Sequence, residues 1–317
     1  MGLFLVTGGA GFIGSNITRA LVARGDRVRV FDNFLTGRPE NLADLPDVEV
    51  VRGDLRDLGG LRTVMAGVDC VLHQAALPAV PRSIRDPAAS NESNVTGTLN
   101  VLLAARDAGV RRVVCASSSS VYGDTPTLPK VETMAPSPLS PYAVTKLAGE
   151  HYCSVFNRLF GAEAAALRYF NVFGPYQDPA SEYAAVIPLF ITAMSRGEQP
   201  FVEGDGTQSR DFTFVDNVVR ANLLAAEAKG IGGEVFNIAC GQAYTLLQLI
   251  AALNRILRTD LRPRFGEPRP GDVKHSQADV TKAKRMLGYE PTVSFEEGLE
   301  RTVAWRRAQE VAIAYNK

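Results

Sequence analysis

Three glycines near the N-terminus constrain the fold more than any other feature of the sequence. Gly8, Gly11 and Gly14 are spaced three residues apart, directly after the apolar run 3–6 and at the start of a helical pattern over 14–24. Glycine lets the backbone turn tightly and approach a ligand, and a helix N-terminus offers free N–H groups and partial positive charge. A strand, a glycine-rich loop and a helix in this order predict a parallel α/β sheet that binds a pyrophosphate. The alternative is a glycine-rich turn without a ligand.

The first half of the chain alternates strand patterns with helical patterns, of which the clearest covers 98–108. Because parallel strands need long crossover connections, this order predicts an α/β fold with a Rossmann-like, doubly wound parallel sheet. The expected strands are 3–6, 28–32, 48–52, 70–73 and 112–116.

The pattern changes after about Gly174, where prolines and glycines become frequent and long loops separate short helices. We therefore expect a Rossmann domain over 1–174 and a smaller, loop-rich α+β lobe over 175–317. The run 234–239 is strand-like again and is expected to return to the main sheet, which would make the boundary interleaved. The helices expected after the boundary are 186–196, 215–228 and 246–257.

The composition is that of an ordinary globular protein, with 46% hydrophobic and 21% charged residues and a formal net charge of +0. Overall charge therefore gives no reason to expect a nucleic-acid or membrane partner. The four cysteines form no metal-binding pattern, which favours free thiols and no metal site. The sequence contains no recognisable targeting signal or membrane-spanning run, so the cytoplasm is the expected location.

Acidic residues follow two of the expected strands. Asp32 ends the second strand, where a carboxylate can accept both hydroxyls of a ribose and would repel the additional phosphate of NADP. The expected dinucleotide is therefore NAD. Asp54 follows the third strand and could reach the adenine end; by its spacing alone, a surface aspartate in a turn is equally consistent.

A tyrosine and a lysine four residues apart form the candidate catalytic group. Tyr142 and Lys146 share one helix face at this spacing, and Pro141 suits the first turn of that helix. The serine run 117–120 directly follows the fifth strand, and open α/β sheets bind ligands at the carboxyl ends of their strands. We expect these groups to meet beside the nicotinamide, with Ser118 hydrogen-bonded to the reacting hydroxyl. The alternative is a tyrosine and a lysine on a helix surface.

The lysine is expected to make Tyr142 a base. A free phenol titrates near ~10, and lowering its pKa to about 7 takes roughly 4 kcal/mol. An ammonium group at ~4 Å supplies up to about 4 kcal/mol at an effective dielectric constant of ~20, and a positive nicotinamide ring adds to this. Tyr142 is therefore expected to be substantially ionised at neutral pH.

These residues resemble the extended short-chain dehydrogenase/reductase family and, more narrowly, its UDP-hexose 4-epimerases. The resemblance covers nearly the whole chain. It implies reversible epimerisation at carbon 4 of a UDP-hexose through a transient 4-keto intermediate, with NAD tightly bound. Besides the glycine motif and the Tyr142/Lys146 pair, it rests on the segments 32–33, 117–123, 167–175, 204–206, 209–212 and 269–272.

The resemblance also implies two sets of binding residues. The set that holds NAD is Gly8, Gly11, Phe12, Ile13, Gly14, Asp32, Asn33, Asp54, Leu55, Ala75, Ala76, Asn94, Tyr142, Lys146 and Tyr169. The set that holds the UDP-sugar is Ser83, Ser118, Ser119, Asn171, Val186, Val202, Arg210, Arg269, Asp272 and Ser276. In the second set the resemblance assigns the diphosphate to Asn171, Arg210 and Arg269, the uridine ribose to Asp272, and the uracil to Val186 and Val202. Arginine forks match phosphate oxygens.

Two serines bear on which sugar is bound. The run 77–83 resembles the branch that acts on N-acetylated sugars, where Ser83 would face the sugar. Ser276 stands where relatives restricted to UDP-glucose and UDP-galactose carry tyrosine, and a small serine leaves room for an acetamido group. The resemblance therefore implies turnover of UDP-N-acetylglucosamine and UDP-N-acetylgalactosamine together with UDP-glucose and UDP-galactose.

Other members of the same superfamily are alternatives. Sugar-nucleotide 4,6-dehydratases place an Asp-Glu pair where this chain has Ser119 and Ser120, so elimination chemistry would lack its acid and base. A UDP-glucuronate 4-epimerase, or another enzyme that modifies nucleotide sugars, stays open. A NAD-binding regulator without catalysis is disfavoured by Tyr142 and Lys146.

The resemblance finally implies a homodimer. The helix that carries Tyr142 would pair with the helix near 94–108 across a two-fold axis. The sequence itself supports only apolar content in these segments, namely Leu99, Leu102, Leu103, Leu147 and Phe156.

Overall fold

A seven-stranded parallel sheet organises the chain. The computed structural model describes residues 2–181, 184–267 and 273–315. Its strands lie in the order β11-β6-β5-β4-β1-β2-β3, with every neighbouring pair parallel. They are β1 (Leu3–Thr7), β2 (Arg27–Asp32), β3 (Glu49–Arg52), β4 (Cys70–His73), β5 (Arg112–Ser118), β6 (Ala164–Tyr169) and β11 (Val235–Ile238).

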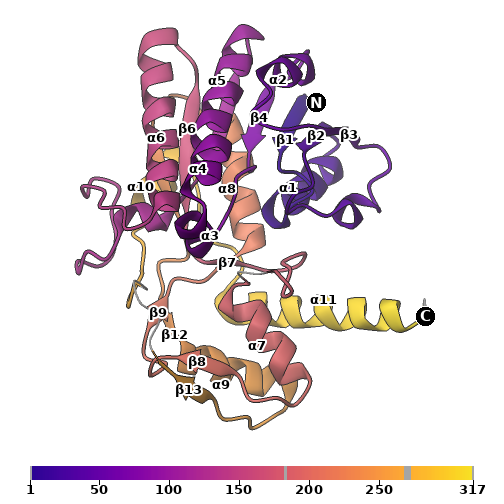
Figure 1. Ribbon diagram of the computed structural model, residues 1–317, viewed down its shortest axis with the longest axis vertical. Coiled ribbons are helices and arrows are strands. Elements are labelled where there is room, and N and C mark those ends of the chain that lie inside the picture. The colour runs from indigo at the N-terminus through magenta and orange to yellow at the C-terminus, as the bar shows by residue number, and fades with distance from the viewer. Residues whose placement is uncertain (1, 182–183, 268–272, 316–317) are drawn as a thin grey trace.

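Helices cover both faces of this sheet (Figure 1). Successive side chains of a strand point to opposite faces, so Phe4 and Val6 of β1 join one buried cluster and Leu3 and Leu5 join another. The first cluster packs against α1 (Phe12–Ala23) and α8 (Val215–Glu227), and the second against α2 (Leu58–Val64), α5 (Gly97–Asp107) and α6 (Pro141–Phe160). The predicted Rossmann-like, doubly wound sheet is confirmed.

The strand order reverses between β1 and β4, which places the site. From β1 the chain proceeds to β2 and β3 on one side, and β4, β5, β6 and β11 extend the sheet on the other. The loops that leave the carboxyl ends of β1 and β4 therefore diverge and leave a crevice between them, where open α/β sheets bind their ligands. The glycine loop after β1 and the segment 74–79 after β4 border this crevice.

Segments far along the chain return to the sheet. β11 pairs with β6 at the edge, at the residues where the sequence places a returning strand. The helix expected over 215–228 is α8, which lies on the sheet and contacts α1 rather than standing in the small lobe. The division of the chain at Gly174 stays a prediction.

The small lobe is built from short strands and helices below the sheet in Figure 1. Its helices are α7 (Val186–Ser195) and α9 (Leu246–Leu257), and the pairs β8/β13 and β9/β12 flank them. The short strands are β7 (Val172–Phe173), β8 (Phe201–Glu203), β9 (Ser209–Arg210), β10 (Thr213–Phe214), β12 (Tyr244–Thr245) and β13 (Arg264–Gly266). The remaining helices are η1 (Pro39–Leu42), α3 (Val80–Arg85), α4 (Pro87–Asn91), η2 (Glu92–Thr96), η3 (Ser119–Tyr122), α10 (Thr281–Leu287) and α11 (Phe295–Tyr315).

None of the described helices combines the length and apolar character that crossing a membrane requires. Within the same described ranges, no three acidic, histidine or cysteine side chains are grouped closely enough to hold a metal ion.

Candidate active site

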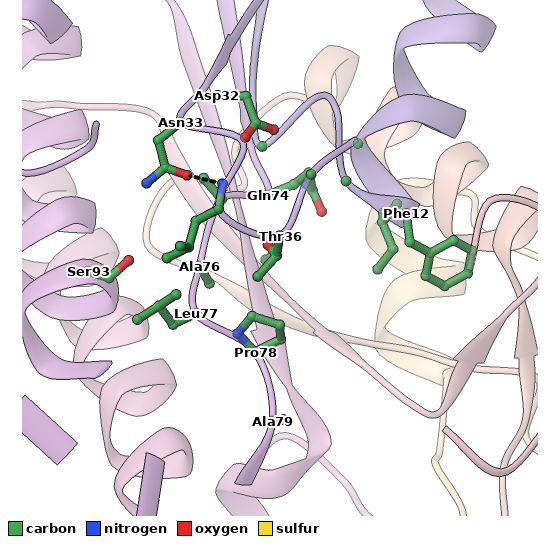
Figure 2. A pocket seen from close by; sticks show the side chains of 18 of the residues that line it. Phe12, Asp32, Asn33, Thr36, Gln74, Ala76, Leu77, Pro78, Ala79 and Ser93 are labelled. Atoms are coloured by element: carbon green, nitrogen blue, oxygen red, sulfur yellow. Dashed lines mark hydrogen bonds between the residues drawn. The ribbon is translucent and has the colours of Figure 1, made fainter. Parts of the chain in front are cut away.

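A cavity of about 690 Å³ lies at the carboxyl ends of the central strands. Figure 2 shows part of its lining: Asp32 and Asn33 at the end of β2, Phe12 at the start of α1, and the chain from Gln74 to Ala79 after β4. The cavity runs from the region of Asp54 and Leu55 to Tyr142 and Lys146. It thus joins the expected adenine end to the expected catalytic group.

Backbone packing explains why glycines stand in the loop after β1. Gly8 has φ +70°, and a Cβ built there would lie 2.7 Å from the backbone N and Cα of Ala75. A Cβ on Gly14 would lie 2.1 Å from the carbonyl oxygen of Gly8. The helix α1 can therefore begin directly against the loop, with its N-terminal N–H groups directed at the cavity.

Asp32 and Asn33 form the polar wall at the end of β2. The Asp32 carboxylate is nearly buried and accepts the backbone N–H groups of Ala10 (3.0 Å) and Phe34 (2.8 Å). Asn33 donates to Asp54 Oδ2 at 3.0 Å, and Arg56 binds both oxygens of the same carboxylate at 2.9 Å. The Arg56 side chain holds the pKa of Asp54 well below its usual range. Asp54 is therefore fixed as an anion beside the cavity.

The structure brings the three predicted catalytic residues together. Tyr142 and Lys146 lie on the first turns of α6, which begins at Pro141 and is capped by Ser140. The hydroxyl of Ser118, at the end of β5, hydrogen-bonds that of Tyr142. Lys146 Nζ donates to the carbonyl oxygen of Ala116 at 2.9 Å and lies 5.8 Å from the centre of the Tyr142 ring.

The electrostatics differ from the sequence-based expectation. Burial raises the pKa of Tyr142 to about 12, and the hydrogen bond with Ser118 opposes this only partly. Burial also lowers the pKa of Lys146 to about 8. The expected lowering came from Lys146, whereas the causes that set the pKa of Tyr142 here are burial and the hydrogen bond with Ser118. Without a cofactor, burial outweighs the hydrogen bond from Ser118, so the expected ionisation of Tyr142 at neutral pH would need a further positive charge, such as that of a nicotinamide ring.

A buried ion pair fixes the end of β5 against α6. Ser117 donates to Glu150 Oε1 at 2.5 Å, and Arg168 of β6 binds both oxygens of Glu150 at 2.8 and 2.7 Å. The side chains of Glu150 and Arg168 are each 4% exposed. Because Glu150 lies one turn beyond Lys146 on α6, this pair holds the catalytic helix in register with the serine run.

Fourteen of the fifteen residues predicted to hold NAD line the cavity. They are Gly8, Gly11, Phe12, Ile13, Gly14, Asp32, Asn33, Asp54, Leu55, Ala75, Ala76, Tyr142, Lys146 and Tyr169. Asn94 is buried behind the wall: it binds the backbone N–H and carbonyl of Leu77 at 2.7 and 3.1 Å and donates to the Thr145 hydroxyl at 3.1 Å. It therefore positions the loop after β4 on α6, and its direct contact with NAD stays a prediction.

Sequence reasoning missed several lining residues. Gln74 follows β4 and accepts a hydrogen bond from the Tyr169 hydroxyl at 3.1 Å. Ser93 also lines the cavity and lies beside Leu77 in Figure 2. The position of Gln74 at the carboxyl end of a central strand is a signal that could have identified it. Arg38 and the residues Tyr176–Asp178 also line the cavity, and no sequence pattern indicated them.

Three of the predicted substrate residues lie together, and two lie outside the described ranges. Asn171, Arg210 and Ser276 lie close together: Asn171 donates to Ser276 Oγ at 3.2 Å, and Ser276 N–H binds the carbonyl of Ser209 at 3.0 Å. Arg210 donates to the carbonyl of Lys274 at 3.0 Å. Arg269 and Asp272 lie outside the described residues. The predicted diphosphate contacts therefore stay predictions.

Of the other predicted substrate residues, two have structural roles in the protein and two lie next to residues of the site. Ser83 is fully buried, donates to the Val80 carbonyl at 2.7 Å and accepts the N–H of Tyr142 at 3.0 Å, so its hydroxyl holds the N-terminus of α6. Val202 is 0% exposed within the core, so contact with uracil would require repacking. Ser119 begins η3 after Ser118, and Val186 begins α7 after the lining residue Ala185. Their contacts with substrate stay predictions.

The residues of the cavity fit NAD. The cavity has the volume of a large ligand site, glycine backbone lies at the N-terminus of α1, and a nearly buried carboxylate stands at the end of β2. Gly8 and Gly14 leave no room for side chains where a pyrophosphate would approach. Gly37 packs against Asp32, with a built Cβ 2.8 Å from Oδ2, so a side chain at position 37 would meet the carboxylate that is expected to bind the ribose.

Known proteins share both the sequence and this architecture. Residues 4–239 match the NAD dependent epimerase/dehydratase family. The chain is 40% identical over 309 residues to the UDP-glucose 4-epimerase of Mycolicibacterium smegmatis, covering 96% of this chain and 98% of the relative.

Two solved structures superpose closely. The UDP-N-acetylglucosamine 4-epimerase of Methanobrevibacter ruminantium, in complex with UDP-N-acetylmuramic acid, has a TM-score of 0.93 and 39% identity over 97% of this chain and 99% of that one. The UDP-glucuronic acid 4-epimerase of Bacillus cereus, bound to UDP-glucuronic acid and NAD, has a TM-score of 0.90 and 34% identity over 97% and 99%. By sequence, fold and site, this chain belongs to the NAD dependent epimerase/dehydratase family.

Proposed function

We propose that this chain is a NAD-dependent UDP-sugar 4-epimerase, an isomerase that interconverts UDP-N-acetylglucosamine with UDP-N-acetylgalactosamine and UDP-glucose with UDP-galactose. The observation that carries the proposal is the pair Tyr142 and Lys146 in the wall of a cavity that fits a dinucleotide, with Ser118 hydrogen-bonded to Tyr142. When bound, NAD accepts a hydride from carbon 4 of the sugar and returns it to the opposite face.

The chain's own residues move the proton. Tyr142 takes the proton of the 4-hydroxyl and later returns it, while Ser118 hydrogen-bonds the same oxygen. Lys146, anchored on the Ala116 carbonyl, keeps a positive charge beside the tyrosine and favours its ionised form. Between the two transfers the 4-keto sugar must turn over about its link to the diphosphate, so the sugar pocket has to accept two orientations.

The purified protein tests this function directly. We expect NAD to be released on denaturation, and we expect the native protein to convert UDP-galactose and UDP-N-acetylglucosamine with no added cofactor. Absence of turnover of every UDP-sugar by NAD-loaded protein would contradict the proposal. UDP-glucuronate belongs in the same assay, because Arg82 lines the cavity beside Ala79 and could bind a carboxylate, and a relative acts on that sugar.

The breadth of substrates rests on Ser276. This side chain is small and lies against Asn171, whose amide donates to it at 3.2 Å. We expect Ser276→Tyr to lower kcat/KM for UDP-N-acetylglucosamine at least about tenfold more than for UDP-galactose, because tyrosine fills the space that the acetamido group needs. Steady-state kinetics on both sugars measures this, and Ser276→Ala is the matched control that keeps the space open. Equal losses on both sugars would show that Ser276 does not limit sugar size.

The same family likeness motivates a proposed homodimer, in which exposed apolar side chains of α6 would join the residues expected from the sequence. Leu102 and Phe156 are 1% and 4% exposed and belong to the protein core, and Leu99, Leu103 and Leu147 pack against core clusters. Leu102 and Phe156 face inward because α5 and α6 cover the sheet, whereas the other three leucines are only partly buried. The apolar surface of α6 is formed by Val144, Val155, Leu159 and Phe160, which are 44–70% exposed.

We expect light scattering to give twice the mass of one chain for the wild type. Leu159→Glu places a charge on the 70% exposed position and should shift the protein towards monomer, because a charge buried in an apolar interface loses its hydration. Leu189→Glu on α7, where the leucine is 46% exposed, is the matched control and should not change the mass. A wild-type monomer at every concentration would refute the dimer.

A further inference from the structure

The segment Pro175–Ser181, which we call the strap, crosses from β7 towards α7. Four of its residues, Tyr176, Gln177, Asp178 and Ser181, line the cavity that the glycine loop and Asp32 also line. In Figure 1 it runs in the space between α1 and α11, and contacts to both helices confirm this place. The strap therefore forms part of the wall of the cavity that the glycine loop also lines.

Aromatic and polar contacts hold the first half of the strap. The Tyr176 ring lies between the Arg19 guanidinium, 4.1 Å from its centre, and the ring of Trp305, whose centre is 5.1 Å away. Asn16 of α1 donates to the carbonyl of Pro175 at 3.1 Å. Tyr176 itself has φ +69°, a backbone conformation that a side chain of this size rarely adopts. Such a conformation persists only where the surroundings hold it.

An ion pair holds the second half. Asp178 accepts from the guanidinium of Arg38, which stands just beyond Asp32 in the loop after β2. Both residues line the cavity, and they come from different segments: Arg38 belongs to the loop after β2 and Asp178 to the strap. The Arg38–Asp178 pair therefore ties the strap to the dinucleotide-binding loops at the cavity wall.

We propose that the strap retains the dinucleotide, with Tyr176 clamped between Arg19 and Trp305 and with Asp178 paired to Arg38. An enzyme that returns a hydride to its own substrate must not lose the reduced cofactor during turnover, so slow release has a use here. The inference rests on NAD occupying this cavity and is independent of which sugar is epimerised. It gives a role to an aspartate that would otherwise only repel the phosphates of a dinucleotide.

Because of this repulsion, whether Asp178→Asn speeds or slows NAD release distinguishes the two roles of Asp178. If Asp178 acted on the cofactor only through its charge, Asp178→Asn would remove a repulsion and slow NAD release. If Asp178 latches the strap, the same variant should speed release about 2- to 5-fold, since an exposed ion pair contributes little and the side chains of Arg38 and Asp178 are 53% and 27% exposed. Tyr176→Ala removes the clamped ring and should speed release about tenfold, a difference of ~1.4 kcal/mol in the release barrier.

Release can be followed on the NAD-loaded protein without any sugar. NAD that leaves is trapped by excess alcohol dehydrogenase and ethanol, and the rate of NADH formation gives the release rate. Trp305 is the single tryptophan of the chain and contacts Tyr176, so its emission reports separately on the strap. We expect the emission to change on NAD loading in the wild type and in Tyr176→Phe, which keeps the ring.

Two controls distinguish loss of the Arg38–Asp178 ion pair from a non-specific loss of structure. The charge swap Arg38→Asp with Asp178→Arg should release NAD more slowly than either single variant, because the pair is restored. Glu290→Ala breaks the exposed Lys284–Glu290 pair away from the cavity and should leave release unchanged. Wild-type or slower release in Asp178→Asn, or no recovery in the charge swap, would overturn the proposal. Should Tyr176→Ala not fold, the Asp178 variants and the charge swap still decide it.

Discussion

Replacing Tyr142 with phenylalanine should abolish nearly all epimerase activity while leaving the fold and the bound NAD in place. The phenol is the group at this end of the cavity that can take the proton of the sugar 4-hydroxyl, and loss of a general base typically costs about 10²- to 10⁴-fold in rate. The ring would keep its place on α6, because Ser83 and Ser140 hold the backbone N–H groups of Tyr142 and Ala143. The measurement is kcat with UDP-galactose, alongside the NAD content of the purified variant.

The pKa values of Tyr142 and Lys146 bear on the loss of activity expected for Tyr142→Phe. Burial raises the pKa of Tyr142 to about 12, so the phenol needs nearby positive charge to act as a base at neutral pH. Burial lowers the pKa of Lys146 to about 8, so this side chain still carries most of its charge there. Ser118→Ala is the matched comparison: it removes one hydrogen bond to the Tyr142 hydroxyl and should cost less than Tyr142→Phe. A Tyr142→Phe enzyme with wild-type kcat would remove Tyr142 from the mechanism.

Gly14→Ala should eliminate NAD retention and with it the activity of the protein as purified. The added Cβ would lie 2.1 Å from the carbonyl oxygen of Gly8 and 2.8 Å from both the carbonyl carbon of Gly8 and the Cα of Gly9. All three atoms are backbone, so no side chain can rotate away, and α1 must move off the loop that receives the pyrophosphate. We expect less than about one tenth of the wild-type NAD content, since displacing several charge-assisted contacts costs well over ~1.4 kcal/mol.

Gly149→Ala is the control for this substitution. A Cβ at Gly149, also on a helix, would meet nothing closer than a Thr98 methyl group at 3.7 Å, so the substitution should fold normally and keep NAD. Circular dichroism checks whether Gly14→Ala keeps its secondary structure. Wild-type NAD content in folded Gly14→Ala protein would contradict the assignment of the glycine loop as the pyrophosphate site.

Local patterns in the sequence were sufficient for most of the sheet and for the cofactor side of the site. Strands β1 to β5 lie within two residues of the ranges expected from apolar runs. The glycine spacing and Asp32 are local signals, because a tight turn and a carboxylate at a strand end are needed wherever this loop occurs. The pair Tyr142/Lys146 is local in the same sense, since four residues are one helical turn.

Other elements gave no local signal. β6 begins with Ala164-Ala165-Ala166, residues that favour helices, yet it lies in the sheet between β5 and β11 with every residue buried. Alanines suit this position because α6 on one side and α8 on the other pack closely over the strand. Tertiary contact therefore overrides the propensity of these residues.

The sequence by itself determined the class of fold, the nucleotide loop and the catalytic pair, because each depends on spacing within one turn, one strand or one strand–loop–helix unit. Only the tertiary structure decided that Ser83 caps the catalytic helix, that Leu102 and Phe156 belong to the core, and that Asp178 meets Arg38 across 140 residues of chain. It also showed that burial raises the pKa of Tyr142 despite the hydrogen bond with Ser118. These outcomes depend on which segments the fold brings together and on how much water it excludes from them. The spacing of residues along a short stretch of sequence specifies neither.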